Sequence, residues 1–166
     1  MLKIEKITAT IGAEISGISL NRDLTSAVCN EIYDALIDNQ VIFFRDQNIT
    51  PEVHLQLAKS FGEPEPPHPV YPHVEGYENI VLLKSGGGSI PDTNDWHKDL
   101  TFKANPPFTS ILHGVDVPEI GGDTLWASTS AAYDNLPDAW KMHLEGLEAM
   151  HDMGTFRNDF YKKGGI

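Results

Sequence analysis

The stretch Trp96-His97-Lys98-Asp99-Leu100-Thr101-Phe102 follows a glycine-rich segment, and the rest of the chain is best interpreted outward from it. In an extended strand, side chains two residues apart point to the same face. A strand here would aim the His97 imidazole and the Asp99 carboxylate into one space. These are two of the three groups in the 2-His-1-carboxylate arrangement that holds non-haem Fe(II). The triplet alone leaves open an ordinary histidine and aspartate on a half-exposed strand.

The composition is that of an ordinary globular domain. The chain has 166 residues, of which 40% are hydrophobic and 22% are charged, so one domain with its own core is expected. There are 12 Lys and Arg against 24 Asp and Glu, and the formal net charge is −12. Because nucleic acids and anionic membranes reward clustered basic residues, neither is predicted as a partner. A small anion held by a few local donors remains compatible with this charge.

The sequence lacks three features that would indicate secretion or membrane insertion. The single cysteine, Cys29, can form no disulfide within the chain, which fits a reducing compartment. The N-terminus has no long apolar segment typical of a signal peptide. No run of about 18 apolar residues occurs, so no membrane span is predicted. We therefore expect a cytoplasmic protein, and the sequence leaves open whether it forms a homo-oligomer.

Periodicity predicts alternating strands and helices in the first half. Thr25 and Thr50 are both placed to cap helices, and Pro51 suits a first helical position. The expected elements are strands within residues 2–10 and 41–44, a helix from Thr25 to about Asn39, and a helix from Thr50 to Gly62. Residues 11–20 are expected to form a turn followed by a short strand or an irregular segment. A further buried strand is expected at residues 80–83.

Residues 62–76 contain five prolines, with His68, Tyr71 and His73 between them. Proline excludes a helix or a central strand here, so a stiff loop is predicted. A stiff loop can hold a histidine and a tyrosine ready for a ligand at low entropic cost. An exposed proline-rich surface loop without a ligand is the alternative.

The second half is predicted to contain more strands, with two helices. The expected elements are strands at residues 109–117, 123–126 and 146–153, a short helix at 128–133, and a helix opening at Leu136-Pro137. No internal repeat is found.

Several blocks, taken together and in order, resemble the taurine dioxygenase family, the TauD/TfdA-like oxygenases that depend on Fe(II) and 2-oxoglutarate. The blocks are His68-Pro-Val-Tyr-Pro-His73, Asn94-Asp-Trp-His-Lys-Asp-Leu-Thr-Phe102, Pro106-Pro107 and Gly121-Gly-Asp-Thr-Leu-Trp126. The resemblance covers essentially the whole chain. It implies a mixed α+β fold whose core is a double-stranded β-helix, or jelly roll, with flanking helices.

The resemblance also implies roles for single residues. His97 and Asp99 fall on the first two iron ligands of the family. Thr124 falls on the threonine that hydrogen-bonds a carboxylate of 2-oxoglutarate, and a hydroxyl is a suitable donor to that anion. His68 and Tyr71 fall on positions that contact the sulfonate substrate, where N–H and O–H donors suit sulfonate oxygens.

The sequence departs from the family pattern near the substrate and at the far end. Thr93 stands where the taurine enzymes place an asparagine, and Phe156 matches a pocket phenylalanine only with the register shifted by one. The family's second iron-binding histidine and its 2-oxoglutarate-binding arginine match no residue here. We therefore expect residues 1–166 to be a single dioxygenase domain lacking its C-terminal part, with an incomplete jelly roll.

The function implied by the resemblance is hydroxylation of a small anionic substrate with O2. For taurine or a related sulfonate, the products would be sulfite and an aldehyde, together with succinate and CO2. Two alternatives stay open at this point. The same chemistry could act on a sulfate ester, a carboxylate or a phosphonate, or the chain could be a truncated, non-catalytic module that binds a small anion.

Overall fold

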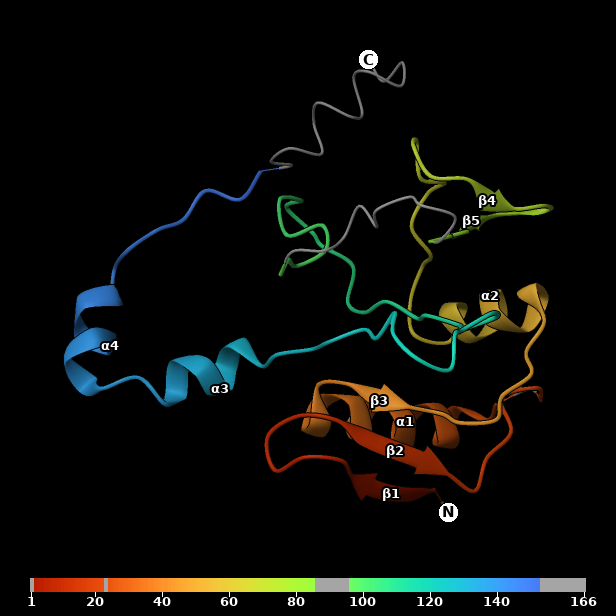
Figure 1. Ribbon diagram of the computed structural model, residues 1–166, viewed down its shortest axis with the longest axis horizontal. Helices are drawn as coiled ribbons and strands as arrows, with labels where there is room; N and C mark the ends of the chain where they lie inside the picture. The colour runs from red at the N-terminus through yellow and green to blue at the C-terminus, as the bar shows by residue number, and fades with distance from the viewer. Residues whose placement is uncertain (1, 23, 86–95, 153–166) are drawn as a thin grey trace. The chain divides into compact units, whose positions relative to one another are not determined.

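The computed structural model describes residues 2–22, 24–85 and 96–152 (Figure 1). The chain divides into two units, one made of Met1–Phe61 with Leu112–Leu147 and the other of Gly62–Ile111 with Glu148–Ile166. Each unit therefore joins an early segment of the chain to a later one.

The first unit begins with a three-stranded mixed sheet in the order β1-β2-β3 (Figure 1). Strand β1 (Lys3–Lys6) runs antiparallel to β2 (Ala13–Ser16), and β3 (Ile42–Phe43) runs parallel to β2. Parallel neighbours need a crossover connection. Helix α1 (Ser26–Asn39) supplies it, so the sequence order strand, helix, strand predicted for this region is confirmed.

The buried apolar side chains of the first unit come from the sheet, from both early helices and from the segments before these helices. Along β2, Ala13 and Ile15 are buried whereas Ser16 is exposed, which is the alternation of a strand with one buried face. Ile15 is only 2% exposed. The remaining buried apolar residues are Leu20, Ile32, Ala35, Ile49 and Leu57. On α1, Ile32 and Ala35 are three residues apart, so they lie on one face of the helix.

The two early helices begin where the sequence predicts. The Thr25 hydroxyl accepts a hydrogen bond from the amide three residues on, at 3.3 Å, and caps α1. Thr50 makes the same contact at the start of α2 (Pro51–Lys59), whose first residue is proline. These caps satisfy amide groups that have no partner within the helix.

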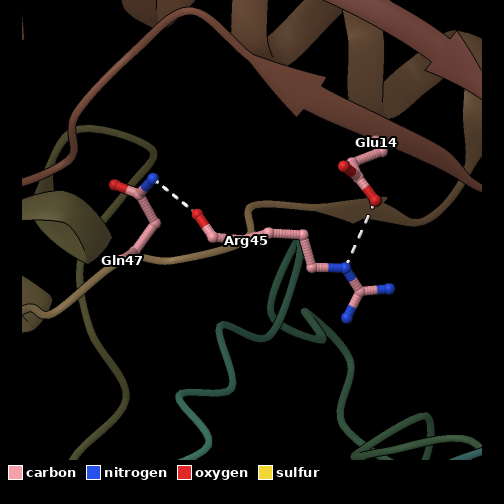
Figure 2. Close-up of polar contacts among 3 residues, drawn as sticks. All are labelled: Glu14, Arg45 and Gln47. Carbon is pink, nitrogen blue, oxygen red and sulfur yellow. Dashed lines mark hydrogen bonds and ion pairs between the residues drawn. The ribbon is translucent and has the colours of Figure 1, made fainter.

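Polar contacts fix the segment that follows β3. Figure 2 shows Arg45 Nε donating to Glu14 Oε2 at 3.3 Å, and Gln47 Nε2 donating to the Arg45 carbonyl at 2.8 Å. Gln47 Oε1 in turn accepts from the Leu20 amide at 2.8 Å. One side chain therefore ties the segment between β3 and α2 to the segment before α1.

The later part of the first unit is helical at its end. Helix α3 (Thr129–Asp134) is capped by Ser128, whose hydroxyl accepts from the Ala131 amide at 3.0 Å. Helix α4 (Asp138–Leu144) follows directly after Pro137. Both helices confirm the prediction. Within the described ranges, every helix is too short or too polar to cross a membrane.

The second unit contains a two-stranded antiparallel hairpin. Strand β4 (His73–Val74) pairs with β5 (Tyr77–Val81), and Gly76 adopts a positive φ of 77° in the turn between them. The Leu82 amide extends the pairing by donating to the Pro72 carbonyl at 2.8 Å. The strand predicted at 80–83 therefore exists but runs from Tyr77 to Val81, and its residues are exposed or half-buried rather than buried as expected. The end of the proline-rich segment forms the short β4.

Four predicted strands are wrong in the described part of residues 96–152. They are the stretches at 96–102, 109–117, 123–126 and 146–153, the last ending outside the described residues. Leu100 has a positive φ of 52° and Gly146 has a positive φ of 81°, and both values are incompatible with an extended strand. The described residues form helices and two small sheets, so a mixed α and β architecture is established, while the jelly roll stays a prediction.

Candidate functional site

The His97–Asp99 pair forms through a turn rather than a strand. Residues 96–98 are irregular and a turn begins at Asp99. Leu100 adopts the left-handed backbone conformation, and its carbonyl accepts from the Lys103 amide at 3.0 Å. His97 Nε2 lies 3.4 Å from Asp99 Oδ1. The two side chains share one space, as the sequence predicts, but a tight turn brings them together.

The donor set of this pair fits Fe(II). An imidazole nitrogen and a carboxylate oxygen are ligand types that non-haem iron takes. Both side chains are exposed to solvent, 53% for His97 and 64% for Asp99. Among the residues that the structure describes, no group of three or more His, Cys, Asp or Glu could hold a metal ion. The pair therefore supplies two candidate ligands, and a set of three would need a ligand from beyond the described residues.

His68 is held in one tautomer by the backbone of its own loop. Its Nδ1 accepts from the Val70 amide at 3.2 Å and from the Tyr71 amide at 3.1 Å. An imidazole whose Nδ1 accepts twice carries its proton on Nε2. The rings of His68 and Tyr71 lie with their centroids 4.7 Å apart. The proline-rich loop thus brings together the two predicted substrate-binding residues.

The second histidine of the loop supports the first. His73 Nε2 donates to the His68 carbonyl at 2.9 Å, where the short strand β4 begins. Burial lowers the pKa of His68 below its usual 6.5, and the charge of His73 lowers it further. Both effects favour the neutral imidazole, which keeps one N–H donor.

The lowered pKa of His68 predicts a pH dependence of stability. The unfolded chain binds more protons than the native one below pH 6.5, so the His68 contribution is complete above pH 6.5 and is lost as pH falls toward the native pKa. We expect the wild-type urea midpoint to fall between about pH 8 and pH 5 more steeply than that of His68→Gln. His143→Gln on α4 controls for the loss of one histidine. Equal slopes for His68→Gln and wild type would contradict the prediction.

Thr124 lies in the first unit, in an exposed irregular segment. Two residues on, Trp126 meets Phe43 of β3 edge to face, with ring centroids 5.3 Å apart. The Arg45 guanidinium lies 5.4 Å from the centre of the Phe43 ring. This aromatic contact anchors the Thr124 segment to the sheet. Sequence reasoning missed the role of Phe43, because only its apolar character was visible in the run 41–44.

The remaining candidates fall elsewhere. Thr93 and Phe156 lie outside the described residues.

A groove of about 540 Å³ in the first unit is lined by Ile4, Lys6, Glu31, Asp34, Ala35, Asp38 and Asn39. It includes none of the candidate residues, and its carboxylates would repel an anion, so it is not a candidate site for an anionic substrate.

Long-range contacts within the second unit were also missed by sequence reasoning. Lys103 Nζ forms an ion pair with Glu65 Oε2, and His151 Nδ1 lies 2.9 Å from Thr101 Oγ1. Both join the segment just after Asp99 to distant parts of the chain. No local pattern marks such pairs, because their partners are 38 and 50 residues apart.

Comparison with known proteins places these features in a family. The family model described as "Taurine catabolism dioxygenase TauD, TfdA family" matches residues 3–164. The chain therefore belongs to the TauD/TfdA family, and the resemblance noted in the sequence is confirmed.

Individual relatives cover most of this chain. An alkylsulfatase of Acinetobacter baylyi is 42% identical over 90% of the chain and 47% of its own length. An alpha-ketoglutarate-dependent sulfate ester dioxygenase of Pseudomonas putida is 39% identical over 90% of the chain and 49% of its own length. A crystal structure of a taurine dioxygenase from Burkholderia xenovorans matches with a TM-score of 0.78 and 36% identity, covering 87% of this chain and 51% of that one. The chain thus spans about half the length of the relatives it matches.

Proposed function

We propose that the protein is an Fe(II)- and 2-oxoglutarate-dependent dioxygenase that hydroxylates a small sulfonate, with taurine or a related compound as the first candidate. The observation that carries the proposal is the His97–Asp99 pair, 3.4 Å apart, within a family match over residues 3–164. The relative named as an alpha-ketoglutarate-dependent sulfate ester dioxygenase supports the co-substrate, and together with the solved taurine dioxygenase it supports the anionic substrate class.

His97 and Asp99 would hold Fe(II), as the donor types suit that metal. Bound Fe(II), with O2 and 2-oxoglutarate as co-substrates, would supply the oxidising chemistry of hydroxylation, and 2-oxoglutarate would be converted into succinate and CO2. The Thr124 hydroxyl would donate to a carboxylate of 2-oxoglutarate, a charge-assisted hydrogen bond. A jelly-roll core and the lack of a C-terminal part of the domain remain predictions. An intact mass of the purified protein above that of 166 residues would support the prediction that residues 1–166 lack the C-terminal part of the domain.

The substrate would be oriented by the proline-rich loop. A sulfonate oxygen can only accept hydrogen bonds, so it needs donors. His68 offers Nε2–H in its neutral form, and Tyr71 offers a phenol O–H beside it. Local donors are needed because the whole chain carries a net charge of −12. Thr93 and Phe156 are proposed to line the same site.

A sulfate ester is the second candidate substrate. The observation that favours it is the naming of two relatives, at 42% and 39% identity, as an alkylsulfatase and a sulfate ester dioxygenase. A sulfate ester presents the same oxygen acceptors as a sulfonate, so His68 and Tyr71 serve it equally well. A cytoplasmic location stays a prediction, and whether the protein forms a homo-oligomer stays open.

A substrate panel tests the proposal. The full-length protein is incubated with Fe(II), 2-oxoglutarate and O2, together with taurine, longer alkanesulfonates, alkyl sulfates or aryloxy acids. We expect succinate to form in step with sulfite from a sulfonate, or with sulfate from a sulfate ester. Reactions without 2-oxoglutarate serve as the control. If calorimetry shows that these anions bind but none of them yields succinate, the protein is a non-catalytic module that binds small anions rather than an enzyme.

A further inference from the structure

An ion pair joins the two segments that carry the candidate substrate and metal residues. Glu65 lies three residues before His68, and its carboxylate meets the ammonium group of Lys103. Lys103 lies four residues after Asp99 and closes the turn at Leu100 through its own amide. Both paired residues belong to the second unit, so the contact lies within one unit.

Glu65 is anchored from another side as well. Asn79 Nδ2 donates to the Glu65 carbonyl at 2.8 Å, which ties the start of the proline-rich loop to strand β5. Lys103 is anchored by its hydrogen bond to the Leu100 carbonyl at 3.0 Å. The ion pair therefore connects two backbones that are each fixed locally. A bond between fixed partners sets their relative position at little further entropic cost.

The degree of exposure separates this pair from an ordinary surface ion pair. The side chains of Lys103 and Glu65 are 36% and 38% exposed. Those of Lys3 and Glu5, which pair two residues apart in β1, are 67% and 61% exposed. Water and salt screen partly buried charges less than exposed ones. The Lys103–Glu65 pair also spans 38 residues of sequence, so it constrains tertiary structure rather than one strand.

We propose that Glu65 and Lys103 are positioning residues that hold the His68–Tyr71 loop in register with the His97–Asp99 turn. The substrate anion must reach both segments at once, because its oxygens bind the loop while its reacting carbon faces the metal. The pair would thereby set how well an anionic substrate is placed. This inference rests on the proposed function, since it concerns the same site.

Kinetics of the full-length protein test the proposal with whichever anion the panel shows to be turned over. Lys103→Met and Glu65→Gln should each raise the KM of that anion by about 3- to 10-fold, a magnitude typical of residues coupled through one contact. The KM of the co-substrate should stay within about 2-fold of wild type. The double variant should be no worse than either single variant, and the reversed pair Glu65→Lys with Lys103→Glu should recover most of the loss. Lys3→Met is the matched control and should leave both constants unchanged.

Amide hydrogen exchange provides a second measurement that needs no turnover. In Lys103→Met, exchange should quicken in residues 62–74 and 96–105 and stay unchanged in α1. Unchanged exchange in the two segments would overturn the proposal, as would additive effects of the two single variants on KM. If the wild-type protein forms no succinate from any compound of the panel, the proposed function fails. Amide hydrogen exchange in Lys103→Met still decides in that case whether the Lys103–Glu65 pair positions the loop.

Discussion

Replacing His97 by alanine is expected to lower succinate formation at least about 100-fold in the full-length protein. The physical reason is that His97 Nε2 and Asp99 Oδ1, 3.4 Å apart, are the two candidate iron ligands of this chain. Removing the imidazole leaves Asp99 as the one candidate ligand from this segment, and a site that has lost one of its ligands binds a divalent ion more weakly. Asp99→Ala should have an effect of the same size. Succinate is measured together with anaerobic Fe(II) binding by calorimetry, and both should fall.

Two variants control for this result. Lys98→Ala changes the residue between the two candidate ligands, on the same irregular segment, and should keep activity within about 2-fold. His143→Ala removes an exposed histidine from α4 and should also leave Fe(II) binding intact. Turnover that persists in His97→Ala would remove this residue from the metal site. Lost turnover with full Fe(II) binding would assign His97 a different role in the reaction.

Local signals in the sequence predicted the helices and the first sheet well. Thr25 and Thr50 each cap a helix at the predicted position, because capping depends on a hydroxyl and an amide only three residues away. The apolar pattern within residues 11–20 and the run at residues 41–44 likewise correspond to β2 and β3, which the structure pairs in one sheet. These elements are determined by interactions over short stretches, so the sequence pattern contains most of the information.

The strands predicted after residue 96 failed for a reason of longer range. A strand needs a neighbour to pair its amides and carbonyls. The described residues offer no strand neighbour to 109–117 or 123–126, which remain irregular. Apolar side chains there stay open to solvent, with Val115 84% and Leu125 70% exposed. Apolar alternation shows that a segment could become a strand, but pairing decides whether it does.

The candidate site was predictable in its residue types but not in its geometry. His97 and Asp99 do come together, yet through a turn with a left-handed Leu100 that no pattern in the stretch indicated. The tautomer of His68 depends on two backbone amides of its own loop, and only the folded loop brings them to the ring. The contacts that fix this region, such as Lys103 with Glu65, link residues too distant for any periodicity.

Thr124→Val is expected to weaken the apparent affinity for 2-oxoglutarate, raising the co-substrate KM by about 10- to 100-fold, because a hydrogen bond to a charged group contributes about 1.5–3 kcal/mol. Valine keeps the shape and the β-branching of threonine and removes only the hydroxyl. The KM of the anionic substrate should change little, since its proposed donors are His68 and Tyr71. Steady-state kinetics with each substrate varied in turn separate the two constants.

The Thr124 result can be distinguished from a general loss of structure by two further variants. Thr124→Ser keeps the hydroxyl and should restore most of the affinity for 2-oxoglutarate. Thr129→Val makes the same chemical change at an exposed residue five positions on and should have no effect on either KM. The Thr124 segment is held to β3 by the contact of Trp126 with Phe43, so removing one hydroxyl should leave its path intact. An unchanged co-substrate KM in Thr124→Val would place 2-oxoglutarate on other donors. A parallel rise in both KM values would mean that Thr124 supports the whole site rather than the co-substrate alone.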